Sequence, residues 1–443
     1  MLKRSCLVAS SFVLLGASTN SWADEGREQA GGFIQDSSLN VLLRNYYLNR
    51  DFRTGNNGRG SSPNGYREEW AQGFIANFSS GFTPGLIGLG IDAHAYLGLK
   101  LDSGKGRTGT GLLPIDSQGR AEDDYSEAGA AIKARVSKTE LRYGSVSPNV
   151  PVAFVNGTRL LPQTVNGFML TSKEVKDLTV DGGYFTSGSS GSSTNQRGEI
   201  KAFYANREVK SAGYGGLTWN SDPVSASFYA INMRDFWNQY YGNFKRSWKI
   251  NEASTFFTEL SGYYTEAAGK KIAGDVDGLI YSFAAGYAYK GHRITLGWQE
   301  NTANTPYDYL GMDDNLQTTS IYLNNVTNFY AEFNGPNERS KQIRYEYNFV
   351  AMGLPGMTFL ARYTNGWGVD GTHVERSSPY FGKWGDSGKH WESDLELRYV
   401  VQSGKAKGLT TRLRHATHRA NSDQFERDLD ETRLIVEFPI KIF

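Results

Sequence analysis

The last segment of the chain alternates between apolar and charged positions. Every second residue from 434 to 442 is apolar, and charged residues stand between them: Leu434, Val436, Phe438, Ile440 and Ile442 alternate with Arg433, Glu437 and Lys441. Since successive side chains of a β-strand point to opposite faces, this segment predicts a strand with hydrocarbon on one face and water on the other. At the end of a secreted chain, such a strand is typical of the one that closes a transmembrane β-barrel.

The same alternation recurs along the chain in short segments separated by glycine, asparagine, aspartate, serine and proline. A strand that crosses a bilayer at a tilt needs about 9–11 residues, and roughly sixteen to eighteen such segments can be counted. We expect an all-β, antiparallel transmembrane barrel of eighteen strands, because single-chain bacterial barrels have even strand numbers. The phase stays open between residues 178 and 225 and between 318 and 340. A soluble β-propeller or β-helix is the alternative, but the chain shows no repeat of fixed period.

Two kinds of connection separate the predicted strands. Tight junctions at 220–223, 289–292 and 352–356 suit short periplasmic turns. Longer stretches rich in glycine, serine and asparagine suit extracellular loops or loops folded into the barrel. These stretches lie near 51–65, 102–123, 147–177, 187–197, 302–338, 367–389 and 420–429.

The N-terminus has the layout of a secretory signal peptide. Lys3 and Arg4 precede an apolar run that begins at Cys6, and a small residue, Ala23, marks the expected cleavage site. We therefore expect residues 1–23 to be removed and residues 24–443 to form one barrel domain. An anchoring helix is the alternative, but the apolar run is shorter than the ~20 residues that a bilayer span needs. Cys6 is the only cysteine, so the mature chain would lack disulfides and cysteine-bound metals.

Composition supports a barrel over a helical membrane protein. The chain has 26 Tyr, 24 Phe and 9 Trp, yet its mean hydropathy is −0.49. A polar lumen combined with aromatic belts at the two membrane interfaces gives this balance. The net charge of +1 offers no argument for nucleic acid as a partner. Any function of charge must therefore be local.

No motif assembles a catalytic or metal site. There is no G-x-S-x-G elbow, and six histidines lie in separate segments, where we interpret each as a rim or lumen residue: His94, His292, His373, His390, His415 and His418. His415 and His418 would point to opposite faces of a strand, which argues against a zinc pair. Residues 104–109 match a dinucleotide fingerprint but lie in a polar loop, and the acidic residues near 116–124 lack EF-hand spacing. We expect no enzyme activity, no metal and no cofactor.

Arginines on the water-facing phase of the last predicted strands are the main chemical signal: Arg398, Arg412, Arg414 and Arg433. Because barrel closure pairs the first strand with the last, Arg44 or Arg50 would join them. A guanidinium can bind a carboxylate through two parallel hydrogen bonds, so a column of arginines can guide small anions through a pore. Several carboxylates share this phase and can instead form structural ion pairs: Glu392, Asp394, Glu396, Glu431 and Glu437. From these residues alone, both interpretations stay open.

Several stretches resemble the OprD family of substrate-specific outer-membrane carboxylate channels. They are FIQDSSLNVLLRNYYLNRD at 33–51, AYLGLKLD at 95–102, TRLLPQT at 158–164, DFWNQYY at 235–241 and YVVQS at 399–403. The resemblance implies an eighteen-stranded barrel in the bacterial outer membrane, a monomer or weak trimer, with inward-folded loops that constrict the pore. It favours transport as the role of the arginines.

The resemblance also assigns residues to the pore. A basic column on one wall falls on Arg50, Arg67, Arg398, Arg412, Arg414 and Arg433. An electronegative or polar pocket on the opposite wall falls on Tyr330 and Glu332, where glutamate replaces the expected aspartate. The constricting loop falls on Arg159, Pro162 and Gln163.

The expected function is therefore passive, selective uptake of small carboxylate-bearing nutrients. The branch that the chain resembles takes amino acids, above all basic ones, or small peptides, and also admits carbapenem antibiotics. A branch for aromatic or cyclic carboxylates is the alternative, and a barrel with hydrolase or adhesin activity is a more distant one. Expected partners besides the solute are outer-membrane lipid, lipopolysaccharide and the barrel-assembly machinery.

Overall fold

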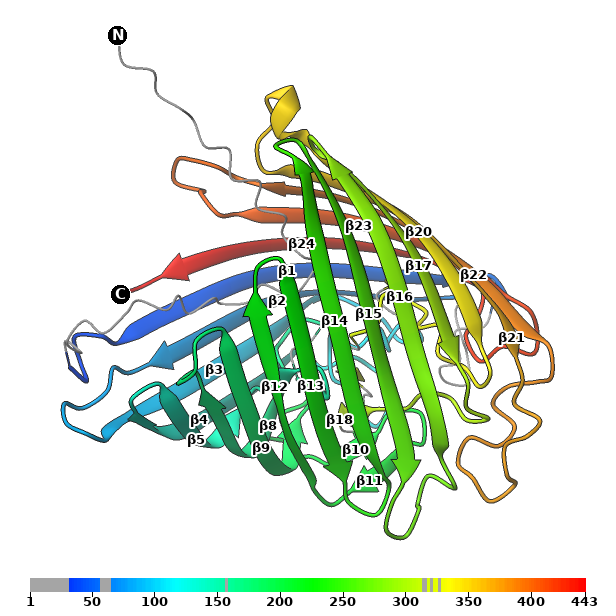
Figure 1. The fold of residues 1–443 in the computed structure, drawn as a ribbon, viewed down its shortest axis with the longest axis horizontal. Coiled ribbons are helices and arrows are strands. Elements are labelled where there is room, and N and C mark those ends of the chain that lie inside the picture. Colours follow the sequence, from blue (N-terminus) through cyan, green and yellow to red (C-terminus); the bar gives the residue numbers. More distant parts are fainter. Residues whose placement is uncertain (1–31, 56–64, 156–157, 313–316, 319–321, 326–327) are drawn as a thin grey trace.

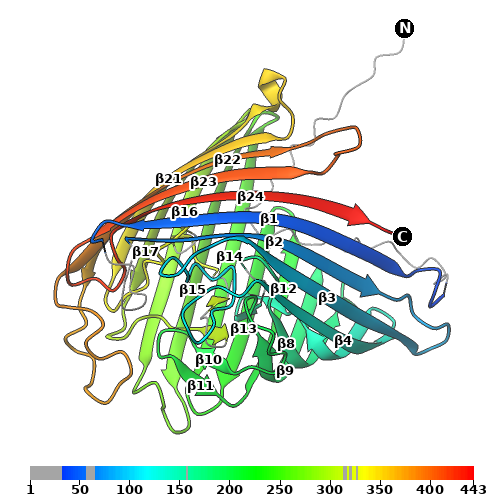
Figure 2. The same ribbon diagram turned by 180° about the vertical axis from the view of Figure 1, so that it is seen from behind.

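Eighteen antiparallel strands form one closed barrel (Figures 1 and 2), as expected from the sequence. The computed structural model describes residues 32–55, 65–155, 158–312, 317–318, 322–325 and 328–443, and the expected signal peptide at 1–23 lies outside them. The barrel strands are β1 (Ser38–Phe52), β2 (Tyr66–Ser79), β3 (Gly88–Asp102), β4 (Asp124–Val136), β5 (Thr139–Val146), β8 (Thr164–Ser172), β9 (Leu178–Ser189), β12 (Ala212–Ser221), β13 (Val224–Met233), β14 (Trp237–Asn251), β15 (Ser254–Ala267), β16 (Asp277–Tyr289), β17 (His292–Asn301), β20 (Arg339–Asn348), β21 (Met357–Val369), β22 (Gly388–Val400), β23 (Thr410–Ala420) and β24 (Leu429–Lys441).

Hydrogen bonds between the first and last strands close the barrel. β1 and β24 pair in one continuous antiparallel register, and the N–H of Ile442 extends it by donating to the carbonyl of Leu39 at 2.8 Å. The blue and red strands accordingly run side by side in both views (Figures 1 and 2). Closure leaves no unpaired strand edge, so the backbone groups of the wall are satisfied without water.

The two faces of β24 match the predicted alternation. Leu434 is 39% exposed on the outer face, whereas Glu431 and Arg433 are buried on the lumen side. β22 and β23 divide in the same way, with Leu395 and Leu413 exposed outside. The wall therefore presents apolar side chains to lipid and charged side chains to the lumen, as a bilayer-spanning barrel requires.

Short turns and long loops occupy opposite ends of the barrel. The tight junctions at 220–223, 289–292 and 352–356 all lie at the end where β24 finishes. Two loop expectations were wrong: the stretch 147–177 contains β8, and the loop after β9 runs from 190 to 211. A register shift beside Asn166 disturbs the alternation of β8, and this concealed the strand in the sequence.

Short elements lie within the connections. β6 (Asn149–Val150) pairs with β7 (Ala153–Phe154), and a separate four-stranded sheet joins two of the long loops. That sheet consists of β10 (Ile200–Ala202), β11 (Arg207–Val209), β18 (Leu310–Met312) and β19 (Gln317–Thr318). A short 3-10 helix, η1 (Phe349–Met352), begins the turn after β20. No helix in the described part of the chain is long and apolar enough to span a membrane.

The loop 147–163 folds back onto the inner wall of the barrel. Leu160 is fully buried in an apolar cluster with side chains of β1 to β4. Gly73 on β2 provides space for it, since a Cβ there would lie 3.3 Å from Leu160. Arg44 on β1 donates to the carbonyls of Arg159 and Leu160 at 2.9 and 3.0 Å. Apolar burial and one arginine thus hold this loop against the wall.

Asp308 joins three loops at one point. Its carboxylate accepts the backbone N–H groups of Tyr204 and Ala205 and the hydroxyl of Tyr380, each at 2.8 Å. Tyr204 belongs to the loop after β9 and Tyr380 to the loop after β21. Asp308 is buried, so these donors would have no partner without it. This aspartate is the hub of the loops that fold inward.

We expect Asp308→Ala to loosen these loops while leaving the barrel folded. Each buried donor left without a partner costs about 1–3 kcal/mol, whereas the strand ladder is untouched. In planar bilayers the variant should show larger and noisier single-channel currents at an unchanged unfolding temperature. Asp308→Asn keeps the side-chain shape and one acceptor oxygen. Its single-channel currents should therefore be intermediate between those of the wild type and those of Asp308→Ala. Currents identical to those of the wild type would contradict the role of Asp308 as a hub.

Candidate functional site

All six arginines of the predicted column lie in directly opposed pairs on neighbouring strands. The pairs are Arg50 with Arg67, Arg398 with Arg412, and Arg414 with Arg433. Like charges directly opposite each other destabilise a sheet. Three such pairs lie on β22, β23, β24, β1 and β2, which are consecutive around the barrel, so this repulsion is concentrated in one part of the wall.

Several of these arginines form an ion pair with a carboxylate through Nε. Nε of Arg50 and Nε of Arg433 both pair with Glu431, and Nε of Arg414 pairs with Glu396. An ion pair at Nε leaves the terminal nitrogens to point elsewhere. The side chains of Arg50 and Arg414 remain 12% and 17% exposed. The ion pairs considered as the structural alternative are thus present, and they orient the arginines.

Nearer the short-turn end, the arginines outnumber the acids. Glu437 pairs with Nε of Arg44 at 2.8 Å and lies 3.6 Å from a terminal nitrogen of Arg412. Nε of Arg398 is buried and has no hydrogen-bond partner within the described residues. The path from Arg50 down to Arg398 therefore keeps an excess of positive charge.

Three further lumen arginines extend the column around the barrel and were missed from the sequence: Arg293 on β17, Arg344 on β20 and Arg362 on β21. Arg362 forms a buried pair with Asp394 at 2.6 Å and stands directly opposite Arg344. Arg293 and Arg344 share Glu346, at 3.6 and 3.4 Å. In the sequence, Arg344 alternates with the apolar residues Ile343 and Tyr345, and this pattern could have placed Arg344 on the lumen face.

The tip of the loop after β17 is held on the same wall as the column. Glu392 on β22 accepts three successive backbone N–H groups, those of residues 329–331, at 2.7–2.9 Å. Arg433 donates to the carbonyl of Phe329, and the guanidinium carbon of Arg414 lies 4.6 Å from the centre of the Phe329 ring. Glu392 was expected among the ion pairs, but it binds loop backbone instead.

Tyr330 therefore lies against the column and not on the opposite wall. The guanidinium carbon of Arg50 is 5.2 Å from the centre of its ring, and the ring of His418 on β23 is 5.1 Å away. The physical reason is the grip of Glu392, which brings the loop tip to β22. Tyr330 thus lies in the lumen as predicted, but on the wall of the arginine column and not on the wall opposite it.

Glu332 lies in a different setting two residues further along the loop. Its carboxylate accepts the hydroxyls of Tyr204 and Tyr309, at 2.9 and 2.6 Å, and the side-chain amide of Asn334 at 3.3 Å. Its side chain is half-buried. Burial raises the pKa of Glu332 to about 7, although these three donors act in the opposite direction. This acid can therefore be charged or neutral near neutral pH.

The remaining predicted residues lie on β2, which carries Arg67, and in the loop 147–163. Arg67 stacks over the ring of Phe52 at 5.0 Å. In the loop 147–163, Arg159 donates through Nε to the carbonyl of Thr110 at 3.0 Å. Burial beside other arginines lowers the pKa of Arg159 to about 10. Pro162 keeps some exposure. The side chain of Gln163 is fully buried, so a passing solute does not reach it in this arrangement.

A buried chain of hydrogen bonds links the loop after β17 to β22 and β23. Glu338 contacts His390 Nε2 at 2.6 Å, His390 Nδ1 contacts His418 Nε2 at 2.9 Å, and His418 Nδ1 contacts the carbonyl of Arg427 at 2.8 Å. A carbonyl can only accept, so His418 donates through Nδ1 and His390 donates to His418. The contact between Glu338 and His390 then holds one shared proton. Burial raises the pKa of Glu338 to about 8, which favours the proton on the carboxyl group.

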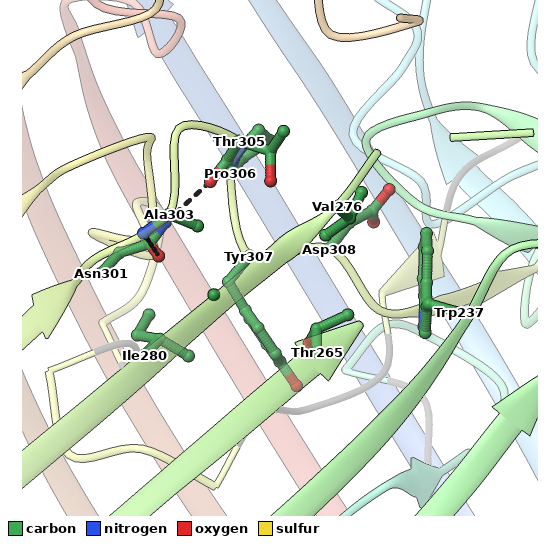
Figure 3. A pocket seen from close by; sticks show the side chains of 11 residues that line it. Trp237, Thr265, Val276, Ile280, Asn301, Ala303, Thr305, Pro306, Tyr307 and Asp308 are labelled. Carbon is green, nitrogen blue, oxygen red and sulfur yellow. Dashed lines mark hydrogen bonds between the residues drawn. The ribbon is translucent and has the colours of Figure 1, made fainter. Parts of the chain in front are cut away.

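The small cavity in Figure 3 is a packing defect between the wall and a loop, and it is too small to bind a substrate. It has a volume of about 10 Å³ and lies between strands of the wall and the first part of the loop after β17. Asn301 closes it by donating to the carbonyl of Thr305 at 3.0 Å, and Tyr307 lies across it. A space of this size holds at most one water molecule.

Comparison with known proteins places this barrel in a family. The family described as "outer membrane porin, OprD family" matches residues 31–442. Porin D of Pseudomonas aeruginosa is 44% identical over 420 residues, which cover 94% of this chain and 93% of that protein. The porin-like protein GalP of Pseudomonas putida is 30% identical over 93% of this chain and 94% of that protein.

Solved structures agree with the sequence relatives. The crystal structure of P. aeruginosa OprD has a TM-score of 0.80 and 40% identity, covering 94% of this chain and 98% of that one. P. aeruginosa OpdK with vanillate has a TM-score of 0.82 and 33% identity, covering 93% and 100% of the two chains. These relatives are channels of the Gram-negative outer membrane and not enzymes. This chain belongs to the OprD family of outer membrane porins.

Proposed function

We propose that this porin passively takes up small carboxylate-bearing nutrients, amino acids with a basic side chain above all, or small peptides of similar charge. The observation that carries the proposal is the set of three opposed arginine pairs on one wall. A sheet accepts such repulsion at a cost to stability. Anionic groups that pass along the wall would relieve it.

The column supports movement of a carboxylate by exchange between neighbouring sites. Guanidinium groups that are already bound at Nε can still offer terminal nitrogens to a second carboxylate. Because the pairs lie at successive levels on β22, β23 and β24, a solute can contact the next arginine before it leaves the last. Several weak sites in sequence favour conduction over trapping.

A cationic group on the same solute would find its partner on the inward loops. Glu332 is the half-buried acid there, fixed by Tyr204 and Tyr309. Its position and the arginine column together favour a solute with both a carboxylate and a positive end. A basic amino acid has both groups. The same recognition would admit carbapenem antibiotics that carry a carboxylate and an amine.

Aromatic or cyclic carboxylates are the second candidate. Phe329 and Tyr330 present rings beside Arg414 and Arg50, and a ring-bearing carboxylate could stack there while its charge binds an arginine. The relative OpdK, whose crystal structure contains vanillate, is consistent with this alternative. Glu332 argues for the basic amino acids, because an uncharged ring gains nothing from its carboxylate.

Uptake of radiolabelled arginine and benzoate by liposomes that contain the purified protein separates the two candidates. We expect arginine to enter faster, because it meets both the column and Glu332, whereas benzoate meets the column alone. Protein-free liposomes provide the background. Equal rates for the two solutes would remove the preference for basic amino acids, and faster benzoate entry would favour the second candidate.

Removal of two column arginines should lower carboxylate flux. We expect Arg412→Ala combined with Arg414→Ala to reduce uptake about tenfold, a change of ~1.4 kcal/mol, and to shift ion preference in planar bilayers towards cations. The matched control is Lys405→Ala with Lys407→Ala, which removes two exposed charges from the turn after β22. Unchanged ion preference in the column variant would contradict the proposed path.

The charge of Glu332 makes cation recognition pH-dependent. Its pKa of about 7 means that the carboxylate is charged above that pH and neutral below it. We expect arginine uptake to fall as the pH is lowered from 8 to 6, while benzoate uptake changes little. Glu332→Gln should give the low rate at every pH in this range. A wild-type arginine rate independent of pH would exclude Glu332 from recognition.

A further inference from the structure

At the loop end of the described strands, outward-facing positive charge occupies one sector of the barrel wall. Among the outward-facing residues in the last four positions of the described strands at that end, the cations are Arg339 and Lys341 on β20, Lys389 on β22 and Arg419 on β23. The corresponding positions elsewhere carry acids or neutral side chains; the acids are Asp51, Glu68, Asp102, Asp124, Glu266, Asp277, Glu300 and Asp430. We call the four cations the cationic strip.

Acids at both margins neutralise the outer members of the cationic strip. Arg339 pairs with Glu300 on β17 at 2.8 Å, and Arg419 pairs with Asp430 on β24 at 2.9 Å. Lys341 and Lys389, which lie between them, are exposed, and neither has a carboxylate within ion-pair distance in the described part of the chain. The uncompensated charge of the strip is therefore at its centre.

The strand register interleaves these cations with tryptophans in two rows. In the row nearer the loops, Trp367 on β21 stands between Arg339 and Lys389. Neighbouring strands are about 4.8 Å apart, so the Cα atoms of these two residues lie about 10 Å apart across the tryptophan. Lys341 belongs to the next row, and its ammonium lies 5.8 Å from the centre of the Trp367 ring.

The second row continues the pattern one level deeper in the membrane. Trp298 on β17 is directly opposite Lys341, and Trp391 on β22 is directly opposite Arg419. Trp298 is 37% exposed and packs edge-on against Trp367 at 5.7 Å. Tryptophan with lysine or arginine at this level marks the boundary between acyl chains and polar headgroups.

We propose that the cationic strip binds the phosphate groups of lipid A, the membrane anchor of lipopolysaccharide. The loop end of an outer-membrane porin faces the outside, where lipid A fills the outer leaflet. Lipid A is a glucosamine disaccharide with a phosphate at each end, so its headgroup offers two anions to Lys341 and Lys389. The tryptophans contact the acyl chains below. Elsewhere on the rim, Asp124, Glu266 and Asp277 form no ion pair within the described residues and repel phosphate, which favours binding at this sector.

This site is independent of the pore. Lys341 and Lys389 point outward, whereas their neighbours Gln342 and His390 point into the lumen. Loss of lipid binding would leave the arginine column and Glu332 in place. Arginine uptake by the same variants therefore separates failure of this inference from failure of the proposed transport function.

The test uses the full-length protein in detergent and lipid A itself as the probe. Binding of bisphosphoryl lipid A and of enzymatically dephosphorylated lipid A is measured by native mass spectrometry for the wild type and for Lys341→Ala with Lys389→Ala. We expect the variant to bind bisphosphoryl lipid A about 30-fold more weakly, since each basic residue near an anionic surface contributes roughly a fivefold factor. The dephosphorylated lipid should bind wild type and variant equally.

A matched control removes two exposed lysines from the opposite end of the barrel, Lys249→Ala with Lys290→Ala, and should bind as the wild type does. Equal binding of bisphosphoryl lipid A by the wild type and the strip variant would overturn the inference. An equal loss of lipid A binding in the Lys249→Ala with Lys290→Ala control would also overturn it. Phosphatidylglycerol that competes as well as lipid A would assign the strip to anionic lipid in general and overturn the choice of lipid A.

Discussion

Buried carboxylates that accept backbone N–H groups hold the inside of this barrel together. Glu392 binds three successive N–H groups of one loop, Asp308 binds two of another, and Glu69 on β2 binds those of Gly109 and Leu112 in a third, at 2.7 and 3.0 Å. Loop backbone has no strand ladder to satisfy it, and a buried N–H without a partner costs about 1–3 kcal/mol. These acids allow the loops to lie inside the pore and so give the pore its constriction.

The binding of loop backbone by buried carboxylates also affects the charge of the lumen wall. A carboxylate that binds loop backbone is no longer available to neutralise an arginine, and Glu392 is the clearest case because it lies on the same face of β22 as Arg398. The acids that do pair with arginines bind several of them at Nε. The inward position of the loops and the positive charge left on this wall are therefore two results of one distribution of carboxylates.

The strands were predictable from the sequence because lipid and water impose a strict alternation, as at Leu434 and Arg433. Barrel closure, and with it the neighbours of Arg50, followed from the same logic. The loops were not predictable in this way. The place of Tyr330 depends on its contact with Glu392, 62 residues away in sequence, and no local pattern encodes that distance. β8 was missed because a bulge interrupts its alternation.

The arginine pairs have one more consequence, which concerns the residence time of a solute. A lone, desolvated guanidinium would bind a carboxylate tightly and release it slowly. Here Arg414 and Arg433 are each already engaged at Nε by a protein carboxylate, so on the proposed path a solute would share these two arginines with a resident partner. On that path the wall would act as a series of exchangeable salt contacts, and throughput would gain from the weakness of each one.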